Sequence, residues 1–142
     1  VVTYVRFGQK VYSPIITQGE ADYIISFEKL EAARYASYLS KGGKIITNTQ
    51  QIDPMPVITG AAAYPETVLD ELRAKGVFVD AIDALSLAVK AGSPKAVNIV
   101  LMGRLAKYFD ISKEKWLEAV RRTVAPKYVE LNEKAFLLGY ED

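Results

Sequence analysis

The feature that most constrains the fold is a change of hydrophobic period near residue 28. Residues Ala21 to Phe27 contain the uninterrupted run Tyr23-Ile24-Ile25, which is typical of a strand covered on both faces. From Glu28 the apolar residues recur at helical spacing, and Gly42-Gly43 is a good stop signal for that helix. A covered strand followed directly by a helix predicts an α/β protein in which helices pack on a sheet.

The same patterns predict the remaining elements. Further strands are expected at Lys44–Thr47 and Val77–Ile82, and a pair of N-terminal strands at Val1–Phe7 and Lys10–Tyr12 around a turn at Gly8-Gln9. Helices are expected from Pro65 to about Lys75, over Ala84–Ala91 with Asp83 as N-cap, from Ser93-Pro94 to Tyr108, from Ser112 to about Val124, and from about Tyr128 to Leu138 before Gly139. Residues 49–63 are expected to form a loop around a short extended piece.

These elements predict a single domain over residues 1–142. We expect a three-layer α/β/α fold with a central mixed or mostly parallel sheet and a helical C-terminal half. No repeat, low-complexity tract or linker divides the sequence.

Composition excludes several functions. With 18 basic and 17 acidic side chains, the formal charge of +1 gives no support for nucleic-acid binding. The chain has no Cys and no His, so it cannot supply thiolates to an iron–sulfur cluster, a thiol nucleophile or a histidine ligand to a metal. An acid–base role would fall to Asp, Glu, Lys or Tyr with a shifted pKa, but nothing in the sequence points to one, so we identify no catalytic residue and no metal ligand. No apolar run is long enough to span a membrane and no signal peptide begins the sequence, so a cytoplasmic location is expected.

Several ordered segments resemble one family. They are Val5-Arg6-Phe7-Gly8, Val11-Tyr12-Ser13-Pro14, Gly19-Glu20-Ala21-Asp22, Phe27-Glu28 with Arg34-Tyr35, Gly42-Gly43 with Asn48, Val79-Asp80, Met102-Gly103 and Ala135-Phe136 with Gly139. Their order and spacing resemble the gamma-type domain of the 2-oxoacid:ferredoxin oxidoreductases, and most closely the beta subunit of the indolepyruvate type. Members of that family usually begin with a strand, a glycine-rich turn and a helix. None of these precedes Val1, so we expect the sequence to start inside a longer protein.

The resemblance implies a subunit of an oxidoreductase that is not catalytic alone. Such enzymes decarboxylate a 2-oxoacid oxidatively to an acyl-coenzyme A and pass electrons to ferredoxin. In the indolepyruvate type, the thiamine diphosphate and iron–sulfur clusters belong to the alpha subunit, so no cofactor is expected on this chain. Two alternatives remain at this point: the gamma subunit of a pyruvate or other 2-oxoacid enzyme, and a standalone ligand-binding or scaffold domain.

Six residues are candidates for contact with substrate, coenzyme A or a partner. Arg6 could bind a carboxylate or phosphate with two hydrogen bonds, or could be an exposed or interface ion-pairing residue. Ser13, Pro14, Gly19 and Glu20 lie on the loop where the resemblance is concentrated, although turn chemistry alone explains Pro14 and Gly19. Asn48 follows a predicted strand at the edge where open α/β sheets bind ligands, and could equally bond local backbone.

Overall fold

A computed structural model describes all residues, 1–142, and has a parallel three-stranded sheet at its centre. The strands are β1 (Ala21–Ser26), β2 (Leu39–Asn48) and β3 (Phe78–Ile82), in the order β1-β2-β3. Ser26 pairs with Thr47, which pairs with Ala81, so the carboxyl ends of the strands meet at one edge of the sheet. The predicted parallel sheet is confirmed.

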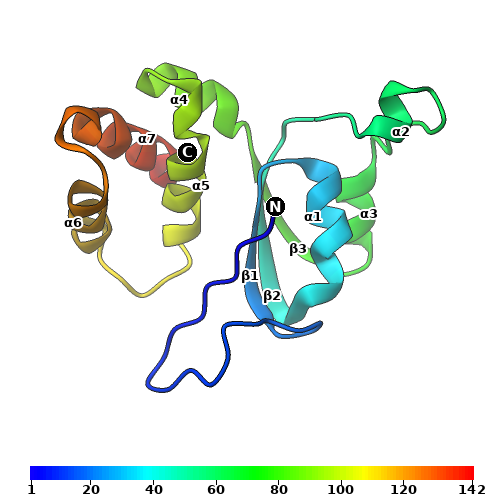
Figure 1. Cartoon of the computed structure of the whole chain (residues 1–142), viewed down its shortest axis with the longest axis horizontal. Helices are drawn as coiled ribbons and strands as arrows, with labels where there is room; N and C mark the ends of the chain where they lie inside the picture. Colours follow the sequence, from blue (N-terminus) through cyan, green and yellow to red (C-terminus); the bar gives the residue numbers. More distant parts are fainter.

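Seven α-helices surround or extend from this sheet (Figure 1). They are α1 (Lys29–Tyr35), α2 (Met55–Ile58), α3 (Val68–Ala74), α4 (Ala84–Ala91), α5 (Val97–Ala106), α6 (Lys113–Thr123) and α7 (Val129–Glu141). Short 3₁₀ turns at Ala36–Tyr38, Pro94–Ala96 and Pro126–Tyr128 follow α1 and precede α5 and α7.

Two neighbouring residues of β2 define the layers. Ile45 and Ile46 are fully buried on opposite faces of the sheet. Ile45 packs in a cluster with Ala32 of α1 and Leu69 and Leu72 of α3, whereas Ile46 packs in a larger cluster with residues of α4, α5 and α7. Figure 1 shows the same division, with α1 and α3 on one side of the sheet and α4 to α7 on the other. The predicted three-layer α/β/α fold and helical C-terminal half are confirmed.

Helices α5 and α7 cross at a pair of glycines. A Cβ atom at Gly103 of α5 would meet the backbone carbonyl of Phe136, and one at Gly139 of α7 would meet that of Val100, in both cases closer than 3.0 Å. The expectation that a helix ends before Gly139 is therefore wrong. Gly139 lies inside α7 because the helix axes approach each other too closely for a larger side chain.

Three other expectations are corrected. The helix that begins near residue 28 ends at Tyr35 and not at Gly42-Gly43. The next strand, β2, starts at Leu39 and not at Lys44, so Gly42-Gly43 lies inside this strand. Gly42, with φ of +81°, lies where the β1–β2 register shifts between the pairs Ala21–Leu39 and Tyr23–Lys44. The region 49–63 contains the short helix α2 rather than an extended piece.

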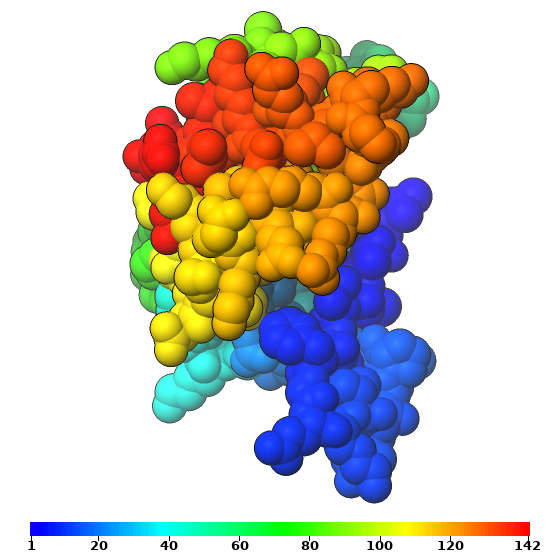
Figure 2. All heavy atoms as spheres, turned by 90° about the vertical axis from the view of Figure 1, so that its left-hand side faces the viewer, coloured from blue at the N-terminus to red at the C-terminus, as the bar shows by residue number.

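The N-terminal region is also unlike its prediction. Val1–Phe7 and Lys10–Tyr12 form no strands, and residues 1–18 make no backbone-to-backbone hydrogen bond as donors. These residues form an arm that projects from the body of the molecule, shown in blue in Figure 2. The strand-forming residues are present, but a strand also needs a paired neighbour, and residues 1–142 supply none to the arm.

Candidate functional site

The arm brings several of the predicted contact residues together. Arg6, Ser13 and Pro14 line an open hollow of about 390 Å³ between the two limbs of the arm, which are residues 4–6 and residues 11–14. The rest of its lining is formed by Tyr4, Val5, Val11 and Tyr12. The hollow is therefore built wholly from residues 4–14, without a wall from the sheet or the helices.

Arg6 ties the limbs of the arm to each other. Its Nη1 atom donates a hydrogen bond of 2.8 Å to the carbonyl oxygen of Ile15 and lies 4.0 Å from Oε2 of Glu20. The same Glu20 oxygen accepts a hydrogen bond from the backbone N–H of Thr17, which holds the pKa of Glu20 below its ordinary value, with a smaller contribution from Arg6. The Arg6 side chain keeps 39% of its surface exposed, so the guanidinium remains accessible to an anion.

The predicted loop residues have local roles in turns. The Ser13 hydroxyl accepts a hydrogen bond from the N–H of Ile15, and Pro14 between them is exposed. Gly19 has φ of +80°, which a residue with a side chain rarely adopts, and its N–H donates to the carbonyl of Ser37. Gly19 thus anchors the end of the arm beside the turn that precedes β2.

Asn48 lies apart from the arm, at the carboxyl edge of the sheet. It is fully buried, and its Oδ1 accepts a hydrogen bond of 3.1 Å from the N–H of Ala84. Its Nδ2 donates to the carbonyl of Phe27 and to Oε1 of Gln50, each at 3.3 Å. The side chain joins the ends of β1 and β2 to the start of α4. The Asn48 side chain therefore makes local hydrogen bonds, which is one of the two roles that the sequence left open.

Glu28, a buried carboxylate near the same edge, was not among the candidate residues chosen from the sequence. Glu28 is 4% exposed; one of its oxygens caps α1 through the N–H of Glu31, and the other accepts a hydrogen bond from the hydroxyl of Tyr64. The Tyr64 oxygen also accepts from the N–H of Leu30 at 3.1 Å. Burial, followed by the bond to Glu28, raises the pKa of Tyr64. Every polar atom of this pair has a protein partner, so the pair fixes the start of α1.

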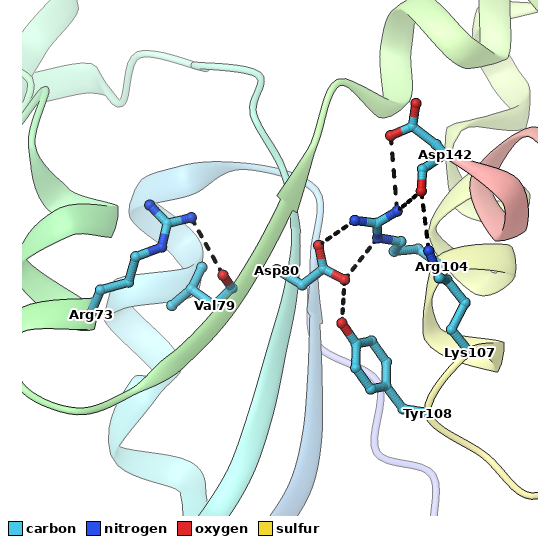
Figure 3. Close-up of polar contacts among 7 residues, drawn as sticks. All are labelled: Arg73, Val79, Asp80, Arg104, Lys107, Tyr108 and Asp142. Atoms are coloured by element: carbon cyan, nitrogen blue, oxygen red, sulfur yellow. Dashed lines mark hydrogen bonds and ion pairs between the residues drawn. The ribbon is translucent and has the colours of Figure 1, made fainter.

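A second polar network joins the sheet to the helical half (Figure 3). Arg104 of α5 donates two hydrogen bonds to Asp80 of β3, at 2.7 and 2.9 Å, and Tyr108 donates a third at 2.5 Å. Nη1 of Arg104 and Nζ of Lys107 also donate to the main-chain carbonyl of Asp142. The Asp80 and Arg104 side chains are only 9% and 17% exposed.

This network shifts three pKa values. Burial alone would raise the pKa of Asp80, but the hydrogen bonds from Arg104 and Tyr108 outweigh it and hold the pKa below its ordinary value. The bond to Asp80 raises the pKa of Arg104, and burial with the same bond raises the pKa of Tyr108 to about 12. A charged residue inside the apolar strand β3 was the signal in the sequence that could have identified this cluster.

No group of three or more Asp and Glu side chains lies close enough together to bind a metal ion. The residues also do not fit an iron–sulfur cluster, because the chain contains no cysteine. None of the helices combines the length and hydrophobicity needed to cross a lipid bilayer.

The fold and the site together define an α/β domain with an exposed N-terminal arm. The sequence model of the family described as pyruvate ferredoxin/flavodoxin oxidoreductase matches residues 1–142. The chain belongs to this family, and the family resemblance found in the sequence is confirmed.

Curated relatives cover nearly the whole chain. Proteins named indolepyruvate oxidoreductase subunit IorB are 43% identical in Thermococcus kodakarensis and 44% identical in Pyrococcus horikoshii, over 98% of this chain and 71% of each relative. The protein of that name in Archaeoglobus fulgidus is 41% identical over 99% of this chain. These relatives are oxidoreductase subunits, as the sequence had led us to expect.

A solved structure supports the fold independently. The gamma subunit of a keto/oxoacid ferredoxin oxidoreductase from Geobacter sulfurreducens aligns with a TM-score of 0.62. It is 23% identical, and the alignment covers 89% of this chain and 66% of that one. At this identity the likeness is evidence for a shared fold.

Proposed function

We propose that this chain is a subunit of an indolepyruvate-type 2-oxoacid:ferredoxin oxidoreductase and contributes contacts rather than redox groups. The observation that carries the proposal is the 43–44% identity, over nearly the whole chain, to subunits named for indolepyruvate. The complex would decarboxylate an arylpyruvate oxidatively to an acyl-coenzyme A and pass the electrons to ferredoxin. Its cytoplasmic location is part of the same proposal.

The residues of this chain support the proposed division of labour. It has no cysteine for cluster ligation, and its buried carboxylates Glu28 and Asp80 are occupied by internal hydrogen bonds. Neither carboxylate is free to act as a general base without breaking the structure around it. We therefore assign thiamine diphosphate and the iron–sulfur clusters to the alpha subunit, and propose that this chain meets that subunit through its arm. Arg6, Ser13, Pro14, Gly19 and Glu20 then act at the contact, while Asn48 holds the sheet edge together.

The test is reconstitution with the cognate alpha subunit. Both chains are purified, mixed and assayed for coenzyme A-dependent reduction of ferredoxin with indolepyruvate or pyruvate as substrate. We expect a stable complex that oxidises indolepyruvate faster than pyruvate. Preference for pyruvate would favour the gamma subunit of a different 2-oxoacid enzyme. A chain that does not bind the alpha subunit, and whose addition leaves its activity unchanged, would point to a standalone domain and refute the proposal.

A further inference from the structure

The segment between β2 and α3 makes no hydrogen bond to the rest of residues 1–142. This segment, residues 51–63, is called the strap below. All of its hydrogen bonds join two of its own residues, such as those from the N–H of Ile58 to the carbonyl of Pro54 and from the Gln51 amide to Asp53. None of its residues belongs to the three hydrophobic clusters, and Figure 1 shows α2 standing off from the layers. Within residues 1–142, the strap is held by its two ends.

The first end is fixed to the sheet. Asn48 is fully buried at the end of β2, and its side chain bonds the carbonyl of Phe27 and the N–H of Ala84. Two residues later, the carbonyl of Gln50 accepts a hydrogen bond of 3.4 Å from the N–H of Lys29. Releasing this end would break contacts that join β1, β2 and α4 at the carboxyl edge of the sheet.

The second end is fixed by one side chain, Tyr64, which is 8% exposed. Its hydroxyl donates to the carboxylate of Glu28 and accepts a hydrogen bond of 3.1 Å from the N–H of Leu30. The ammonium of Lys29 lies 5.3 Å from the centre of the Tyr64 ring. Releasing this end breaks the contacts of one tyrosine and leaves the strands paired, so the second end is easier to open than the first.

We propose that the strap opens about Asn48 as one unit while the rest of the protein stays folded, with the Glu28–Tyr64 hydrogen bond as the latch that closes it. Helix α2 has four residues, far fewer than a helix needs to be stable alone, so the internal hydrogen bonds of the strap are lost when the latch opens. Opening uncovers Glu28 at the carboxyl edge, where open α/β sheets bind ligands. This motion is a property of the chain itself and does not depend on the substrate or partner of the proposed function.

Native-state amide hydrogen exchange, followed by NMR in increasing urea, tests the opening. The full-length protein is used, so that any residues outside 1–142 that pack on the strap are present. The N–H groups of Ile58, Thr59 and Ala62 should exchange at rates that barely change with urea, since a local opening exposes little surface. Those of Ile45 and Ile46, in the central strand, should exchange only by global unfolding and accelerate with urea. Strap amides with the same urea dependence as Ile45 and Ile46 would overturn the local opening.

Two tyrosine variants test the latch. Tyr64→Phe keeps the ring and removes the hydroxyl, so it should accelerate exchange of the strap amides about tenfold, as expected for the loss of one buried hydrogen bond. Tyr108→Phe is the matched control, because it removes a tyrosine–carboxylate hydrogen bond to Asp80 that lies outside the strap. It should accelerate exchange of Ile45 and Ile46 and leave the strap amides unchanged.

Two results with these variants would contradict the proposal. Equal acceleration of the strap amides by Tyr64→Phe and Tyr108→Phe would mean that the strap opens only when the whole protein unfolds. Strap amides that exchange locally but do not respond to Tyr64→Phe would show that the Glu28–Tyr64 bond is not the latch. Both measurements need only this chain, so they remain decisive even if the reconstitution with the alpha subunit fails.

Discussion

Replacing Gly139 by alanine should destabilise the protein, although alanine is the better helix former. A Cβ atom at this position would lie closer than 3.0 Å to the backbone carbonyl of Val100, a separation that Cβ atoms essentially never show. The obstructing atom belongs to the backbone of α5, so no side-chain rotation can relieve the clash. Helices α5 and α7 must move apart instead.

The expected magnitude is the difference between two opposing effects. Alanine gains about 1 kcal/mol over glycine in a helix interior. Forcing an extra methyl group into a packed contact costs about 3 kcal/mol where backbone must shift, and separating the helices opens voids around the fully buried Leu101, Ala135 and Phe136. The net loss is about 2 kcal/mol, which for a domain of this size lowers the melting temperature by about 8 °C.

Thermal unfolding followed by circular dichroism measures this effect. Ala119→Gly, on an exposed position of α6, is the control for helix propensity and should cost about 1 kcal/mol. The double variant Gly103→Ala with Gly139→Ala should lose less than the sum of the two single changes, because one separation of the helices relieves both clashes. A Gly139→Ala protein that melts above the wild type would refute the close crossing of α5 and α7.

Three further predictions concern the buried polar groups. Asp80→Asn should cost about 2 kcal/mol at neutral pH by removing the anion that Arg104 pairs with. The pKa of Asp80 is depressed in the folded protein, so the stabilisation by its carboxylate is present above the unfolded pKa of about 3.9 and is lost as the pH falls through the folded pKa. The free energies of unfolding of variant and wild type, measured with urea, should therefore converge in acid. A constant difference between them would contradict the pairing. The pKa of Tyr108 is raised to about 12, so the stabilisation by its hydroxyl is present below the unfolded pKa of about 10 and is lost as the pH rises through about 12. Tyr108→Phe should therefore reduce the loss of unfolding free energy at alkaline pH, measured with urea. An unchanged dependence of this free energy on pH would argue against the Tyr108–Asp80 bond. Tyr64→Phe leaves an oxygen of buried Glu28 without its partner and should lower stability by about 2 kcal/mol in thermal unfolding, whereas a neutral result would mean that the hydrogen bond adds nothing.

Local signals in the sequence were sufficient for much of the fold. Asp83 and Ser112 cap α4 and α6 as predicted, each accepting a hydrogen bond from the N–H three residues later. The strands β1 and β3 also lie where their apolar runs placed them, within one residue at each end. Caps and short apolar runs are read from neighbouring residues, so they need no knowledge of tertiary contacts.

The errors have a common physical origin in contacts between distant segments. Gly42-Gly43 looks like a helix stop but lies inside β2, where it accommodates a register shift against β1. Gly139 looks like another stop but serves the crossing of two helices. A glycine can end a helix or allow two backbone segments to approach closely, and sequence spacing alone does not distinguish these roles.

The polar residues of the candidate site also differ in whether neighbouring sequence alone could identify their contacts. Arg6, Ser13 and Pro14 are near one another in sequence, and the structure brings them into one hollow. Asp80 and Arg104 are 24 residues apart, and Glu28 and Tyr64 are 36 apart, so their pairing depends on the fold. Asn48 was placed correctly at the sheet edge, but only the structure shows that its hydrogen-bonding atoms are already occupied.

The hollow in the arm is better suited to a protein contact than to a small ligand. Its volume of about 390 Å³ falls within the range of ligand pockets, but such pockets enclose most of the ligand surface. Here all lining residues come from one exposed arm, so nothing closes the opposite side. Arg6 bonds the Ile15 carbonyl through Nη1 and keeps an accessible guanidinium edge, which could pair with a carboxylate brought by another chain. Residues 1–142 therefore form only one side of the hollow, which leaves Arg6 open to a carboxylate but does not enclose a small ligand.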